Sequence, residues 1–314
     1  MKQHLLTLQG GESTALRVSA DVLVEVVSAL IEGARQATRL AVDGESTRKG
    51  PRPAWLDAAC HFEVTGLTPG SVRVSLEAPT LADAAPDILG AAEQAALFAD
   101  PTERIDGAHT AIDLFGRVLA AVIAGNGDAV LADRSMLDSC ARFSRAARGR
   151  YGSIELAGIS GLDRPLTVRP EDISTIERLR DQIPAPRATR LVGTLDTISI
   201  TKPDVVLRLD DGSSVTARAS ETDVTALKTL FGEKVVVSGV AHFRPSGKVL
   251  RIDIEHLGPA RKEDEVFARA PMSPTMPLAS LLTQDDANGV ADFFGAWPGD
   301  ESDEELLASL EAQR

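Results

Sequence analysis

Five short strands separated by turn signals occupy residues 187–258, and this pattern restricts the fold more than any other feature of the sequence. Asp210-Asp211-Gly212 and Pro245-Ser246-Gly247 are turn sequences between strand-like runs. A helix N-cap at Ser220 or Thr222, and Gly232 after the apolar residues, predict a short helix over 220–230. The expected strands are 187–200, 205–209, 215–219, 234–243 and 248–256.

The order of three strands, a helix and two strands resembles the OB-fold, a small five-stranded Greek-key barrel. The resemblance lies in the order of elements within 187–258 and not in a sequence motif. It implies binding of single-stranded nucleic acid through exposed aromatic side chains and a basic groove. Phe231 and Phe243 are the only aromatic residues there, and we expect both to lie in the core. Because the segment is also nearly neutral, we favour a structural or protein-contact module and keep nucleic-acid binding as the alternative.

Residues 1–183 predict an α+β domain ahead of this barrel. Apolar residues recur at helical spacing from Leu23 to Ala37, after Ser19 as a candidate N-cap. Leu67-Thr68-Pro69-Gly70 is a hairpin sequence between two strand-like runs. Helices are expected over 19–40, 90–99, 108–124, 133–149 and 170–182, and strands over 4–8, 61–66, 71–78, 153–157 and 166–169. Helices and strands do not alternate strictly, so the fold class is α+β and not a doubly wound sheet.

Proline-containing boundaries divide the chain into domains. Ile183-Pro184-Ala185-Pro186 ends the last helix of the first domain, and Gly258-Pro259 follows the last strand of the barrel. Residues 259–277, rich in Lys, Glu, Pro and Met, predict a linker. Residues 278–314 are an acidic tail, and the segment 259–314 carries −8 of the net charge of −13. A net charge of this sign argues against general binding to phosphate backbones.

The acidic tail also contains large apolar residues. Ser302-Asp303-Glu304-Glu305 is a capping box with acids in the first turn, so a short helix is expected there. A helix of about ten residues is marginal alone in water. Acid-rich segments with a few apolar anchors often fold onto a partner, and docking onto the chain's own domains is the alternative. The expected partner-binding anchors are Phe293, Phe294, Trp297, Leu306, Leu307 and Leu310.

The end of the tail contains a pattern shared with a family of regulatory proteins. Phe294-Gly295-Ala296-Trp297 precedes an acidic stretch, Glu304-Glu305-Leu306-Leu307 and the final Arg314. This pattern resembles the toxin-binding tails of type II antitoxins, especially those paired with PIN-domain ribonuclease toxins. The resemblance implies that Trp297 is a buried anchor and that Arg314 reaches the carboxylates of the toxin. It also implies a toxin as the protein partner, although this chain is longer than typical antitoxins of that kind.

Residue types that support catalysis are present but not grouped. Cys60 and His61 are adjacent and would point to opposite faces of a strand, so they do not form a thiol–imidazole pair. His109 lies near Asp106 and Asp113, which the start of a surface helix explains better than acid/base or metal chemistry. We therefore predict that the protein is not an enzyme and binds no metal or cofactor.

Two basic clusters are further candidates for binding. One is the loop Arg48 to Pro53, and the other comprises Arg142, Arg145, Arg148 and Arg150. They could pair with phosphates or with an acidic partner, but a solvated loop and a helix C-terminus that favours cations explain them better.

Isolated cysteines and the lack of long apolar runs indicate the cellular compartment in which the protein is expected. Cys60 and Cys140 form no metal-binding motif, and no run approaches the roughly 20 apolar residues of a membrane helix. The start of the chain lacks the apolar segment of a secretory signal. These features predict a cytoplasmic protein without membrane association, and they leave its oligomeric state open.

Overall fold

The computed structural model describes most of the first 268 residues. The described residues are 1–10, 19–68, 72–88, 105–127, 132–146, 148, 150–198, 204–218, 227 and 229–268. Residues 1–273 form one compact unit and residues 274–314 a second. Within the described part, buried residues gather into two hydrophobic cores, one between residues 6 and 179 and one between residues 191 and 254.

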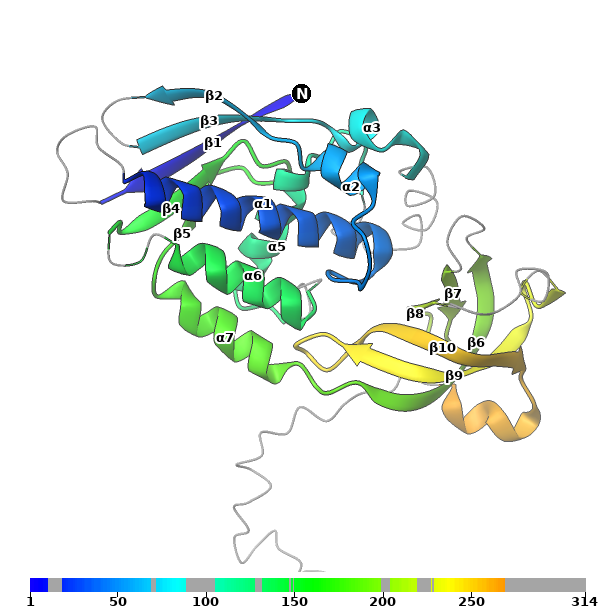
Figure 1. Cartoon of the computed structure of the whole chain (residues 1–314). Coiled ribbons are helices and arrows are strands. Elements are labelled where there is room, and N and C mark those ends of the chain that lie inside the picture. The colour runs from blue at the N-terminus through cyan, green and yellow to red at the C-terminus, as the bar shows by residue number, and fades with distance from the viewer. Residues whose placement is uncertain are drawn as a thin grey trace, which may run out of the picture. The chain divides into compact units, whose positions relative to one another are not determined.

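The first core lies between a five-stranded sheet and a layer of helices (Figure 1). The strands are β1 (Lys2–Gln9), β2 (Glu63–Thr68), β3 (Val72–Ala78), β4 (Ser153–Ala157) and β5 (Leu166–Val168), in the antiparallel order β2-β3-β1-β4-β5. The face away from the helices is polar, where Gln3 donates to Glu77 and Gln9 donates to Glu155. Because one face packs against the helices and the other carries mainly polar side chains, the strands largely alternate between apolar and polar residues.

Helices cover the buried face of this sheet. The longer ones are α1 (Ala20–Asp43), α5 (Ala111–Ile123), α6 (Arg134–Arg145) and α7 (Asp172–Gln182), and the short ones are α2 (Ala54–Ala59) and α3 (Leu81–Ala84). Gly33 lets α1 approach α5 closely, because a Cβ there would lie 2.5 Å from the ring of Phe115. Phe115 in turn packs edge to face on Phe143 of α6, with ring centroids 5.4 Å apart. These rings fill the centre of the first core.

The second core is enclosed by a five-stranded barrel (Figure 1). Its strands are β6 (Arg187–Ile198), β7 (Asp204–Arg208), β8 (Ser214–Arg218), β9 (Lys234–Phe243) and β10 (Val249–Pro259), in the closed order β10-β8-β7-β6-β9. The β10–β8 pairing is parallel and the others are antiparallel. Gly239 lets β9 and β10 come together, because a Cβ there would lie 2.0 Å from the backbone oxygen of Asp253. The closed five-stranded barrel fits an OB-like fold.

The predicted α+β class and the five-stranded barrel are confirmed. Residues 259–267, which we expected to begin a linker, instead contain the end of β10 and the 3₁₀ helix η1 (Lys262–Phe267). The reason is a tertiary contact, since buried Asp264 accepts a hydrogen bond from the N–H of Arg261 and pairs with Arg190 of β6 at 2.7 Å. The expected helices over 90–99, over most of 220–230 and in the tail lie outside the described residues.

Candidate functional site

All the residues that we predicted to bind a partner belong to the C-terminal tail. Phe293, Phe294, Trp297, Leu306, Leu307, Leu310 and Arg314 lie outside the described residues. Their arrangement stays a prediction. The described part of the chain contains two groups of polar side chains that the sequence did not predict to lie together.

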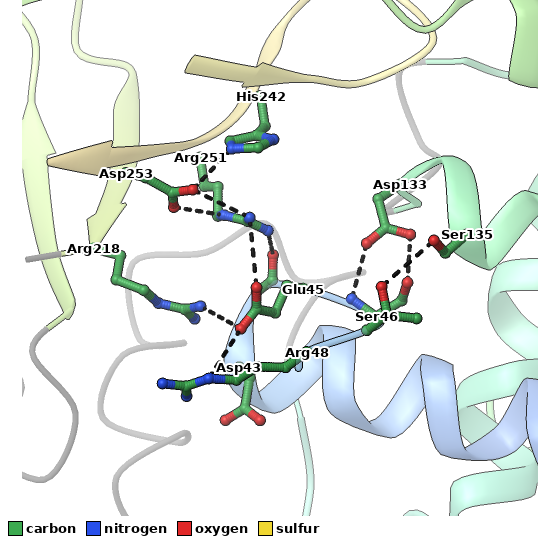
Figure 2. A network of polar contacts seen from close by, with 12 residues as sticks. Asp43, Glu45, Ser46, Arg48, Asp133, Ser135, Arg218, His242, Arg251 and Asp253 are labelled. Atoms are coloured by element: carbon green, nitrogen blue, oxygen red, sulfur yellow. Dashed lines mark hydrogen bonds and ion pairs between the residues drawn. The ribbon is translucent and has the colours of Figure 1, made fainter. Parts of the chain in front are cut away.

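The first group connects the turn after α1 to the barrel, and we name it the charged joint (Figure 2). It consists of Gly44, Glu45, Arg218, Arg251 and Asp253. Helix α1 ends because Gly44 adopts a left-handed φ of 69° and its N–H donates to the carbonyl of Leu40. The turn that follows presents Glu45 to two arginines of the barrel.

These two arginines bind the turn directly. Arg251 of β10 donates through Nη1 to the carbonyl oxygen of Gly44 at 2.6 Å and lies 3.7 Å from the carboxylate of Glu45. Arg218, at the end of β8, pairs with Glu45 at 2.9 Å. The side chains of Glu45, Arg218 and Arg251 are only 17%, 15% and 11% exposed. Ion pairs removed from water to this extent are costly to break, so the joint fixes the turn on the barrel.

Asp253 positions Arg251 from the barrel side of the joint. Its carboxylate accepts a hydrogen bond from Nε of Arg251 at 2.9 Å and lies 2.8 Å from Nε2 of His242. Burial alone would raise the pKa of Asp253, but the hydrogen bonds from His242 and Arg251 hold that pKa well below its ordinary value. The carboxylate is therefore ionised at neutral pH and keeps the guanidinium directed at Gly44.

The next residue of the same turn contacts the helix layer. The N–H and hydroxyl of Ser46 donate to the carboxylate of Asp133 at 2.8 and 2.6 Å. Asp133 is also the N-cap of α6, where it accepts from the N–H of Met136 at 2.9 Å. One short turn thus contacts α6 through Ser46 and the barrel through Gly44 and Glu45 (Figure 2).

The charged joint has the chemistry of a structural connection. Its carboxylates are each engaged by a guanidinium, and its described residues include no nucleophile beside a base. Gly44 after a long apolar helix was a signal in the sequence for the turn itself. No sequence signal connected that turn to β8 or β10, because the partners are far apart along the chain.

The second group surrounds Asp113 near the start of α5. This fully buried carboxylate accepts hydrogen bonds from the N–H groups of Thr110 and Ser160 at 2.9 and 2.7 Å, and it pairs with Lys2 at 2.9 Å. Lys2 also donates to the Ser160 hydroxyl. Burial would raise the pKa of Asp113, but these donors hold it below its ordinary value. Because Lys2 connects Asp113 of α5 to Ser160 in the loop after β4, we interpret the group as structural.

Two histidines border the Asp113 group. Nε2 of buried His4 lies 2.9 Å from the hydroxyl of Thr110, and burial lowers the pKa of His4. Burial also lowers the pKa of His109. We expected His109 and Asp113 at the start of a surface helix. Helix α5 does begin there, but Asp113 is buried because it completes a capping box with Thr110 and takes its other donors from β1 and the loop after β4.

The basic clusters and the cysteines have ordinary environments. Arg48 and Arg52 each pair with an acidic side chain, and Arg145 pairs with α7, while the other three arginines of the second cluster are exposed. Burial raises the pKa of Cys60 to about 12 and also raises the pKa of Cys140. Neither thiol is therefore poised to react.

Comparisons with other proteins give no indication of the function. No protein family matches the sequence, and no curated protein or solved structure matches the chain. Among the described residues, no His, Cys, Asp and Glu side chains gather into a group of three that could hold a metal ion. None of the described helices combines the length and the apolar character needed to cross a membrane.

Proposed function

We propose that this chain is a cytoplasmic, antitoxin-like protein that captures a protein partner through residues 278–314 and blocks its activity. One observation carries the proposal, the succession of Phe294-Gly295-Ala296-Trp297, Glu304-Glu305-Leu306-Leu307 and Arg314. The partner that this pattern suggests is a ribonuclease toxin of the PIN-domain kind. In this proposal the chain itself performs no catalysis and needs no metal or cofactor.

The chemistry of the tail suits such a partner. A ribonuclease presents a basic groove to the RNA backbone, and the net charge of −8 over residues 259–314 is complementary to that groove. Trp297 and the leucines of the final segment supply the large apolar side chains that concentrate binding energy. Arg314 supplies a guanidinium that can pair with the carboxylates of a metal-dependent active site.

The folded part of the chain supports the proposal as a scaffold. The charged joint fixes the turn after α1 on the barrel. At the other end of the described structure, Arg190 pairs with Asp264 and its guanidinium stacks on Phe267, 5.3 Å from the ring centroid. Helix η1 is thus fastened to the barrel.

Inhibition by point variants tests the proposal. A tagged full-length protein first retrieves its co-purifying ribonuclease, which is then purified and titrated with each variant. We expect Trp297→Ala to weaken inhibition by about 2–4 kcal/mol, as for a central anchor. Val266→Ala, which truncates an apolar side chain 81% exposed on η1, is the matched control and should inhibit normally. Equal inhibition by both variants, or retrieval of no nuclease, would count against the proposal.

Nucleic-acid binding by the barrel is the second candidate. The guanidiniums of Arg187 and Arg190 lie 5.3 Å from the ring centroids of Phe243 and Phe267, so cations and aromatic rings meet on β6. These residue types also bind single strands. However, Phe243 is buried, and Arg190 is paired with an acid, so little of this set is free. Binding of a labelled single strand that weakens steeply with salt would favour this candidate, and no binding at low salt would exclude it.

A further inference from the structure

Strand β2 forms one edge of the first sheet. In the described structure it pairs with β3 alone, so the backbone groups on its outer side have no strand partner. Two of its apolar side chains, Val64 and Leu67, are 57% and 61% exposed. A free edge with exposed apolar side chains is a template for pairing with another strand.

A β-bulge in β2 places its two exposed apolar side chains on the same face of the sheet. Side chains three residues apart on a regular strand point to opposite faces. In β2 the register shifts at Thr65, which adds one residue to the strand. Val64 and Leu67 consequently lie opposite Leu76 and Val74 of β3, both of which are buried on the helix-covered face. The two exposed apolar residues therefore share one face of the sheet.

We propose that β2 pairs in antiparallel fashion with β2 of a second copy of this chain, about a two-fold axis through the middle of the strand. This register sets Val64 of each copy opposite Leu67 of the other, on the same face, so two apolar cross-strand pairs form. It sets Glu63 opposite Thr68, so no like charges meet. Without the bulge, Val64 and Leu67 could not meet across such an axis. The occupant is a second copy because the strand is complementary to itself.

The expected dimer is weak. A strand of six residues buries less than the roughly 800 Å² per partner of a standard interface. We therefore expect a dissociation constant on the order of micromolar. β2 contains neither Lys nor Pro, the residues that commonly protect free edges. The inference is independent of the proposed function and would give each assembly two copies of the tail.

Sedimentation velocity of the full-length protein tests the association. Between about 2 and about 200 µM the sedimentation coefficient should rise from that of a monomer toward that of a dimer. Leu67→Lys should stay monomeric at the highest concentration, since it places an ammonium group opposite Val64 in both halves of the interface. Val266→Lys, at an 81% exposed position of η1, should dimerise normally. A monomeric unsubstituted protein, or a dimer that Leu67→Lys leaves intact, overturns the proposal.

Disulfide cross-linking tests the register. A mixture of Val64→Cys and Leu67→Cys proteins should form a linked dimer on mild oxidation. Either variant alone should not, because the bulge leaves equivalent positions about two strand residues, or roughly 7 Å, apart along the strand, and the separation between the two strands adds to this distance and puts them beyond the reach of a disulfide. The native cysteines are buried and do not interfere. Equal yields in the three samples, or none in the mixture, would overturn the proposed pairing.

Discussion

Arg251→Met removes the guanidinium that connects the barrel to the turn after α1, while it keeps much of the apolar stem. The variant loses the 2.6 Å hydrogen bond to Gly44 and the 2.9 Å bond to Asp253. A hydrogen bond to a charged group contributes about 1.5–3 kcal/mol, and the partners left behind lose part of their solvation. Because Glu45 keeps Arg218 and Asp253 keeps His242, the network survives in part. We expect the free energy of unfolding to fall by about 2–4 kcal/mol.

Urea unfolding followed by far-ultraviolet circular dichroism measures this loss. Arg208→Met is the matched control, because Arg208 pairs with Asp196 at 2.8 Å on the same barrel but is 54% exposed. An exposed pair contributes about 0–1 kcal/mol, so the control should resemble the unsubstituted protein. Equal losses for the two variants would refute the reasoning that desolvation in the joint sets the magnitude.

Fluorescence adds a test of coupling between the two cores. Trp55 packs against the first core and the barrel has no Trp, so in a Trp297→Phe background the emission reports the helix-covered sheet alone. With the joint intact, the fluorescence and circular dichroism transitions should coincide. In Arg251→Met they should separate, because the cores are less strongly connected. Coincident transitions in both proteins would show that other contacts provide the coupling.

His4→Gln should reduce the pH dependence of stability. Burial holds the pKa of His4 below the unfolded value of 6.5, so the unfolded chain binds more protons than the folded chain. The stability of the unsubstituted protein should therefore fall as the pH drops from about 7 to about 5. A melting temperature of the unsubstituted protein that is constant over this range would contradict this. Gly239→Ala should lower the free energy of unfolding in urea by more than about 3 kcal/mol, since its Cβ would lie 2.0 Å from a backbone oxygen. Gly258→Ala is the control and should be tolerated, because a Cβ there meets nothing within 4 Å. Cys60 and Cys140 should react with a thiol reagent only after unfolding, and rapid labelling of the native protein would disprove their burial.

The long elements could be predicted because their signals are local. The strand expected over 234–243 is β9, and Gly212 adopts a φ of 81° in the turn that was expected between β7 and β8. Helix α5 begins where Thr110 and Asp113 form a capping box, a signal contained within four residues. Such features depend on neighbours along the chain and leave a pattern in the sequence.

The short helices escaped prediction. Helix α2 has six residues and α3 has four, too few to show helical periodicity. Helix η1 lies where the composition indicated a linker, because Asp264 looks like any solvated acid until Arg190 of β6 packs against it. Composition describes average behaviour and does not detect a single buried ion pair.

The sequence by itself determined the class, the order of the longer elements and the pattern of the tail, because alternation, capping and turn residues act over a few positions. The tertiary structure alone decided which charges distant in sequence meet. Lys2 and Asp113 form an ion pair although they are 111 residues apart, and the Arg251 guanidinium reaches the carbonyl of Gly44 across 207 residues. A buried ion pair between residues distant in sequence requires both groups to be held together away from water, a condition that the packing of distant elements creates and that local spacing does not encode.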